Sequence, residues 1–356
     1  MKLLNHSIKA RILWLLASVL AILIAAPVPR LEAQKTRDET RTVTRWEDSD
    51  SDTGLLRRFE TRGKAEFTDD YTDIKNISEN GWAIIEEHRG QQSYRYEVRH
   101  DASGQLQRLF YVNGAAKPID ADAKAWLAKF VLDIVRQGGY DADKRVKTIL
   151  AQRGVAGVLA EIDLIHGDYA KRVYYEQLLK QANLNAAALR DVLKQMARDI
   201  SSDYEQAQLL RAVAPLMTGK DIALQPYFDA IATINSDYER SNVLKTIVKQ
   251  DAPSSALLVL VAGATKTISS DYERHGVLSV LAKTKNQSEE VLRLLLESAA
   301  AMSSDYEKAS LLMEVSNAYT GDSRLKSEFL KVVETIKSDY ERGRVLSALL
   351  KNKQIG

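Results

Sequence analysis

The string Ser-Asp-Tyr-Glu recurs five times in the C-terminal half of this 356-residue chain. Its aspartates are Asp203, Asp237, Asp271, Asp305 and Asp339, so each copy follows the previous one by 34 residues. A weaker copy, Gly-Asp-Tyr-Ala, places Asp168 another 35 residues upstream. A fixed interval of this length is typical of stacked copies of one supersecondary unit. The sequence therefore predicts a repeat architecture, and the repeat by itself names no reaction.

Each repeat carries two apolar stripes at helical spacing. The copy around Asp271 has Leu257, Val261 and Ile268 before the aspartate, and it has Val277, Leu278 and Leu281 after it. Both sets fit a period of 3.6 residues. Each unit is thus predicted to be a helical hairpin, with helices of about 14 and 13 residues and a linker of about 5. We expect an αα-superhelix of the TPR or HEAT kind over residues 141–356.

The repeated motif has the pattern of a capping box. Its serine is the expected N-cap, and its glutamate is expected to reach back to the N-cap amide. The aspartate places negative charge at the helix start and stands three residues before a basic side chain in most copies. The tyrosine ring is expected to pack between hairpins with its hydroxyl at the rim. These residues are Ser202, Asp203, Tyr204, Glu205, Ser236, Asp237, Tyr238, Glu239, Ser270, Asp271, Tyr272, Glu273, Ser304, Asp305, Tyr306, Glu307, Ser338, Asp339, Tyr340 and Glu341.

A second interpretation of the motif stays open. The copies would also form an acidic and aromatic ladder along one edge, which a partner could recognise. The structural interpretation is preferred, because every motif residue has a local role in it.

The part of the chain before the repeats has a different pattern. Short segments of alternating apolar and polar residues run from Leu55 to Val112, and turn dipeptides such as Asn80-Gly81 and Asn113-Gly114 separate them. This pattern predicts an antiparallel meander of five or six strands with one buried face. The apolar stripe from Trp126 to Ile134 predicts a helix that covers this face. The fold class is therefore α+β, with a small β-domain over residues 55–140.

The N-terminus has the features of a targeting segment. Lys2, Lys9 and Arg11 precede an apolar run over residues 12–26, and Ala33 offers a small residue for cleavage. Residues 1–33 are predicted to be a cleaved signal peptide or an uncleaved membrane anchor. Residues 34–54 are expected to be a flexible tether, with one strand around Val43–Trp46. The remainder would be extracytoplasmic, in the periplasm, secreted, or anchored to the inner membrane.

Composition and motifs exclude several function classes. The net charge of +2 comes without a run of basic residues, which argues against a nucleic-acid partner. The absence of cysteine excludes disulfides and thiol nucleophiles. The chain holds no zinc-peptidase, nucleophile-elbow, phosphate-loop or dinucleotide-binding motif. We therefore predict no catalytic, cofactor-binding or metal-binding residue, no cofactor, and no enzymatic activity.

The last apolar stripe of the chain is a candidate interface. It comprises Val345, Leu346, Leu349 and Leu350, and no predicted helix follows to cover it. An uncovered apolar patch typically marks a contact surface. We expect the C-terminal hairpin to mediate self-association or to bind a partner. In the alternative, basic side chains such as Arg344 and Lys351 drape their stems over the patch.

Several segments carry a resemblance to a known family. They are Gly63-Lys-Ala-Glu-Phe-Thr-Asp-Asp, Ile77-Ser-Glu-Asn-Gly, Tyr111-Val-Asn-Gly and Ala125-Trp-Leu, followed by the Ser-Asp-Tyr-Glu repeats. Over residues 55–356 the chain resembles the bacterial extracytoplasmic region that follows membrane metallopeptidases of the beta-lactam-sensor antirepressor type. The peptidase domain and its zinc signature are absent, so no catalytic residue carries over. The resemblance implies a bacterial, extracytoplasmic protein with a sensing or interaction role.

The expected function is therefore a non-catalytic interaction, sensor or scaffold module that binds a protein or peptide on its helical-repeat surface. Membrane attachment would occur only through the N-terminal segment. The alternative is a hydrolase whose site lies between the β-domain and the first hairpins. His166 close to a carboxylate would favour that alternative.

Overall fold

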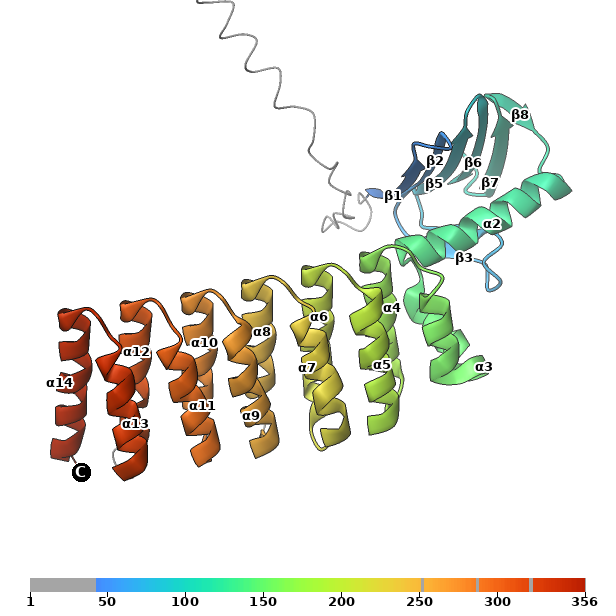
Figure 1. The fold of residues 1–356 in the computed structure, drawn as a ribbon. Helices are drawn as coiled ribbons and strands as arrows, with labels where there is room; N and C mark the ends of the chain where they lie inside the picture. Colours follow the sequence, from blue (N-terminus) through green and yellow to red (C-terminus); the bar gives the residue numbers. More distant parts are fainter. Residues whose placement is uncertain (1–42, 251–252, 286–287, 320–322, 356) are drawn as a thin grey trace, which may run out of the picture. The chain divides into compact units, whose positions relative to one another are not determined.

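A computed structural model describes residues 43–250, 253–285, 288–319 and 323–355 (Figure 1). The predicted signal or anchor segment lies outside these residues. None of the described helices combines the length and the apolarity that a membrane span needs. The chain forms two compact units, one ending at Ala128 and the other beginning at Lys129.

The first unit is built on an antiparallel six-stranded sheet with the order β1-β2-β5-β6-β7-β8, and β3 and β4 pair separately (Figure 1). At the Asn113-Gly114 turn between β7 and β8, both residues have positive φ, 49° and 77°. A two-residue hairpin turn requires this conformation, and asparagine and glycine adopt it readily. The strands are β1 (Val43–Asp50), β2 (Leu55–Arg62), β3 (Ala65–Phe67), β4 (Ile74–Ile77), β5 (Trp82–Arg89), β6 (Gln92–His100), β7 (Leu106–Val112) and β8 (Ala115–Lys117).

Strand β1 occupies part of the segment that was predicted to be a flexible tether. Residues 34–54 were expected to be a flexible tether with one strand around Val43–Trp46, and residues 34–42 lie outside the described residues. Strand β1 begins where that strand was expected but extends over Val43–Asp50, and it pairs with β2 along its whole length. Most of its side chains are exposed, because β1 is an edge strand that contributes little to the core. Without an apolar face, its sequence carries no strong strand pattern.

The predicted covering helix is present in the first unit. Helix α2 (Ala121–Gly138) places the ring of Trp126 5.6 Å from Tyr94 and 5.5 Å from Phe110, measured between ring centroids. The same helix continues past Ala128, so the boundary between the units lies inside α2 and not near residue 140. In the second unit, the Val135 carbonyl of α2 accepts a hydrogen bond from the buried Tyr174 hydroxyl at 3.1 Å.

The second unit is a solenoid of helical hairpins. Figure 1 shows one row formed by α4, α6, α8, α10, α12 and α14, and a second row formed by α5, α7, α9, α11 and α13. Each helix packs against the next one of its own row. The helices are α3 (Ala142–Ile162), α4 (Asp168–Gln181), α5 (Ala186–Asp199), α6 (Asp203–Val213), α7 (Leu224–Ala232), α8 (Asp237–Val248), α9 (Ser255–Ala264), α10 (Asp271–Ala282), α11 (Glu289–Ala300), α12 (Asp305–Val315), α13 (Ser323–Glu334) and α14 (Asp339–Ile355).

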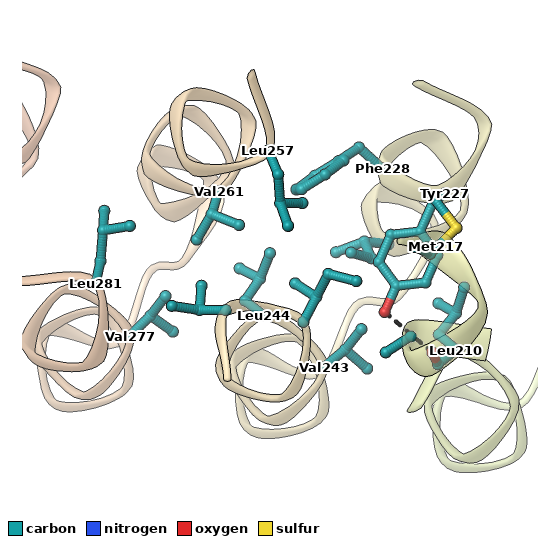
Figure 2. Close-up of a cluster of buried hydrophobic side chains, with 14 of the residues drawn as sticks. Leu210, Met217, Tyr227, Phe228, Val243, Leu244, Leu257, Val261, Val277 and Leu281 are labelled. Carbon is teal, nitrogen blue, oxygen red and sulfur yellow. Dashed lines mark hydrogen bonds between the residues drawn. The ribbon is translucent and has the colours of Figure 1, made fainter. Parts of the chain in front are cut away.

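The predicted apolar stripes form the core of the solenoid. Figure 2 shows Val243 and Leu244 of α8 in one apolar cluster with residues of α9 such as Leu257 and Val261, and all four side chains are buried. The hydroxyl of the buried Tyr227 donates a hydrogen bond to the carbonyl of Leu210 at 3.0 Å, which satisfies the one polar atom of that side chain. The stripe side chains are buried in every described hairpin except at Leu346. The α+β fold with a helical-repeat region is thus the one that the sequence predicts.

Candidate interaction surface

The serine of each motif caps its helix. In all five copies the serine Oγ accepts a hydrogen bond from the amide of the glutamate three residues later, at 3.3–3.4 Å. Helices α6, α8, α10, α12 and α14 therefore begin at the motif aspartate, directly after the serine cap, whereas α4 begins at Asp168 after Gly167, which has no side-chain cap. This fixed start places the same motif residues at the same point of every unit.

The aspartate of each motif binds the following repeat, a contact that the sequence analysis missed. Its carboxylate accepts hydrogen bonds from two consecutive backbone amides that precede the next helix of the row. Amide–carboxylate distances are 2.7–3.1 Å, and we call this contact the aspartate clamp. Asp168 binds Ser201 and Ser202, Asp203 binds Asn235 and Ser236, Asp237 binds Ser269 and Ser270, Asp271 binds Ser303 and Ser304, and Asp305 binds Lys337 and Ser338.

The clamp also explains the electrostatics of these carboxylates. Burial by itself would raise the pKa of Asp271, but the hydrogen bonds from Ser304 and Ser303 and the charge of Arg274 outweigh it and hold the pKa below its usual range. The amide of Ser338 in the same way lowers the pKa of Asp305. The local pairing predicted between the aspartate and the basic residue three positions later is also present, at 3.6 Å for Asp271 and Arg274.

The glutamate of the motif does not close a capping box, so that part of the prediction is wrong. The N-cap amide is already bound by the aspartate of the preceding repeat, and the glutamate instead contacts the residue four positions after that aspartate. Glu205 pairs with Arg172, Glu273 with Ser241, and Glu307 with His275, the last at 2.5 Å between Oε2 and Nδ1. The glutamate is thus a second link between neighbouring repeats.

Two repeats lack this second link because alanine occupies the partner position. Ala207 stands where Glu239 would find its partner, and the Oε2 atom of Glu239 is buried without a hydrogen bond in the described part of the chain. Ala309 stands in the same position before Glu341, which binds Arg344 of its own helix at 2.6 Å. Residue identity at one position therefore decides whether the link forms.

The tyrosine of the motif is exposed, which contradicts the prediction that its ring packs between hairpins. The exposed fractions of the six side chains range from 42% to 75%, and the residues are Tyr169, Tyr204, Tyr238, Tyr272, Tyr306 and Tyr340. The reason is helical geometry, because the tyrosine stands five, six and nine residues before the core residues of its helix, roughly half a turn from the core stripe. We call this row of six side chains the tyrosine edge.

The tyrosine edge separates the two interpretations of the motif. Serine, aspartate and glutamate bind backbone or side chains within and between repeats, so they have structural roles. The tyrosine side chains are the large exposed side chains of the motif, and Arg172 lies over Tyr169 and Arg344 over Tyr306, at 5.2 and 5.8 Å from the ring centroids. A large aromatic side chain that recurs at one exposed position in six successive units is the strongest candidate for contact with a partner.

The predicted C-terminal interface is partly covered. Val345 and Leu349 are buried, which corrects their assignment to an exposed patch. Leu346 is 41% exposed and Leu350 is 64% exposed, whereas Leu312, at the position of Leu346 in the preceding repeat, is fully buried. The stem of Arg344 does not protect Leu346 and Leu350 from solvent. A smaller apolar patch, made of these two leucines, remains at this end of α14.

The described residues were also searched for catalytic groups. His166 is exposed, and no side chain in the described ranges forms an ion pair with its imidazole. A groove of about 460 Å³ in the first unit is lined by Tyr94, Phe110 and Trp126 among others. Three of its lining residues are carboxylates: Glu87 is bound to Arg57 at 3.0 Å, Asp120 accepts a hydrogen bond from the Ala123 amide at 3.0 Å, and Asp122 lies in the first turn of α2. Within the part of the chain that the structure covers, no group of His, Asp and Glu is arranged to hold a metal ion.

A buried ion cluster in the second unit has a structural explanation. Glu161 is buried and accepts hydrogen bonds from Arg136 at 2.7 Å and from Arg145 at 2.6 Å. Burial alone would raise the pKa of Glu161, but the two guanidinium groups outweigh it and lower the pKa. The carboxylate therefore stays charged and joins α2 and α3.

Comparison with known proteins does not assign this chain to a family. No protein-family model matches the chain, and neither a curated protein nor a solved structure matches it.

Proposed function

We propose that this protein is a non-catalytic interaction, sensor or scaffold module that binds a protein or peptide along the tyrosine edge of its solenoid. The observation that carries the proposal is the exposure of the same tyrosine in six successive repeats. Helical solenoids bind partners on long continuous surfaces, because each unit presents equivalent side chains at a fixed spacing. Tyrosine suits this role, since it offers a large rigid ring and a hydroxyl at a low entropic cost.

The proposal includes a location and a second contact surface. The basic flank and apolar run of residues 1–33 support an extracytoplasmic protein, exported by a signal peptide or held at the membrane by residues 12–26. The two exposed leucines of α14, Leu346 and Leu350, support self-association or partner binding at the end of the solenoid.

The experiment compares the parent protein with a variant that lacks the edge. Tyr204, Tyr238, Tyr272 and Tyr306 are changed together to serine, and both proteins are immobilised and exposed to an envelope extract of the cell that makes them. We expect at least one protein that the parent retains and the variant loses, and its direct binding is then measured with purified components.

The matched control is Ile222→Ser, because Ile222 is 55% exposed and lies away from the motif. The control should retain every partner. Equal retention by the parent and the four-tyrosine variant would show that the tyrosine edge is not the binding surface.

A further inference from the structure

The interval between successive tyrosines of the tyrosine edge restricts which backbone conformation a bound partner can have. This inference rests on the proposed function. The aspartate clamp ties the start of one first-row helix to the chain just before the next one, at 2.7–3.1 Å. Helices that pack directly against each other lie about 8–10 Å apart. Because the tyrosine directly follows the clamping aspartate, successive tyrosines repeat at about the same interval along the solenoid.

The space between successive tyrosines has a distinctive lining. The contact of Arg344 with the ring of Tyr306 shows that the residue five positions after one aspartate lies beside the tyrosine of the preceding repeat. At the four earlier junctions, that position holds a glycine or an uncharged polar side chain, namely Gln208, Asn242, Gly276 and Ser310. Each of these residues is partly exposed. Along the edge, exposed tyrosine rings therefore alternate with glycine, serine or amide side chains at these four junctions.

We propose that the tyrosine edge binds a proline-rich segment in the polyproline II conformation, with one turn of the ligand per repeat. This conformation has three residues per turn and a rise of about 3.1 Å per residue, so its turns repeat at about 9.3 Å. That interval falls within the packing distance of the helices. A proline at every third position meets successive tyrosine rings, and aromatic-lined grooves are the usual receptors for such segments.

The polar groups of the edge fit the same ligand. A polyproline II segment forms no internal hydrogen bonds, so its carbonyls need donors from the receptor. The tyrosine hydroxyls and the amides of Gln208 and Asn242 supply donors, and no side-chain hydrogen bond occupies these two amides within the described residues. An α-helical partner satisfies its own carbonyls and leaves these donors unused. A β-strand turns its side chains to opposite faces every residue, so three-residue spacing does not keep them on one side.

Charge also limits the partner. In five of the six copies the tyrosine stands between an aspartate and a glutamate of its own motif, whereas Tyr169 is followed by Ala170. Like charges repel, so a nucleic acid or an acidic polymer is disfavoured there. The ligand is therefore expected to be neutral or mildly basic.

The experiment uses synthetic peptides and the full chain. One peptide series repeats Pro-Ser-Ala over two, three, four and five turns, and a nine-residue control with the composition of the three-turn member places its three prolines four residues apart. Calorimetry should show that affinity rises with each added turn of the three-residue series. We expect the control peptide to bind at least about tenfold more weakly, since its prolines lose register with the tyrosines.

Protein variants locate the site. Replacing Tyr238 and Tyr272 by serine should weaken the four-turn peptide by about tenfold or more, whereas Ile222→Ser should not change its affinity. Circular dichroism melting should be the same for all three proteins, because the substituted side chains are mostly exposed.

Three outcomes would overturn the inference. Equal binding of the two proline spacings would exclude the register argument, and tyrosine-independent binding would place the site elsewhere. If no proline-rich peptide binds but the parent still retains a partner that the four-tyrosine variant loses, this inference fails while the proposed function stands. If the variant loses no partner either, both fail.

Discussion

Replacing Asp271 by alanine removes one aspartate clamp and leaves the apolar core unchanged. The Asp271 side chain is 12% exposed, and it accepts hydrogen bonds from the amides of Ser303 and Ser304 at 2.8 and 2.7 Å. A hydrogen bond to a charged group contributes about 1.5–3 kcal/mol to stability. Water reaches both amides once the carboxylate is gone, so the lower value applies to each. We expect Asp271→Ala to reduce the free energy of unfolding by about 3 kcal/mol.

Asp339 provides the matched control at the same motif position. Its side chain is 90% exposed and pairs only with Arg342 of its own helix among the described residues. No clamp is broken by Asp339→Ala, so its effect should be that of an ordinary surface substitution, within about 0.5 kcal/mol. The difference between the two variants isolates the contact between repeats from the charge at the helix start.

The effect of Asp271→Ala should depend on pH with a defined sign. The pKa of Asp271 is lowered in the folded protein, so the unfolded chain binds this proton more readily. The stabilisation is therefore present above the unfolded pKa of about 3.9 and is lost as the pH falls through the folded pKa. The difference between parent and variant should be constant from roughly pH 8 to 5 and should shrink below about pH 4.

Urea denaturation followed by circular dichroism measures the stability change, and hydrogen exchange locates it. The amides of Ser303 and Ser304 should exchange faster in Asp271→Ala, because they lose their acceptor. Equal stability losses in the Asp271 and Asp339 variants, or unchanged exchange at both serines, would refute the clamp.

Three further predictions address the links, the end of the solenoid and the N-terminus. Ala207→Ser should supply a hydroxyl to the unpaired Oε2 of Glu239 and stabilise the protein by about 1 kcal/mol in urea denaturation; a loss of stability would show that the partner position is misassigned. The double substitution Leu346→Lys and Leu350→Lys should abolish self-association in sedimentation experiments, and a parent that is already monomeric would contradict this prediction. Cell fractionation with N-terminal sequencing should find the chain in the envelope, beginning near Gln34 or retaining its apolar segment; a full-length soluble cytoplasmic form would exclude export.

The core of the solenoid was predictable because it depends on helical periodicity. Residues such as Leu244 and Val261 recur at fixed offsets from the motif aspartate, and both are buried as expected. Serine N-caps are local to one helix and were predictable for the same reason. Strand β1 was predicted only over Val43–Trp46, and its second half was missed, since its edge position leaves no apolar alternation to detect.

The roles of Asp, Glu and Tyr in the motif required the structure. A capping box satisfies the helix start within one repeat, but the stacking of repeats brings Asp271 to the amide of Ser304, and this contact joins residues 33 positions apart. Local sequence rules do not consider such pairs. The exposure of Tyr272 could have been derived from its position on the helix, about half a turn from Val277 and Leu278. The prediction instead followed the general tendency of aromatic rings to be buried.

The central claim is that a partner covers the tyrosine edge, and tyrosine nitration read by mass spectrometry tests it directly. In the free protein, Tyr238, Tyr272 and Tyr306 should be nitrated quickly, while the buried Tyr227 should resist. Saturation with the purified partner should protect the three edge tyrosines. Bound protein whose edge tyrosines react as fast as in the free state would contradict the account.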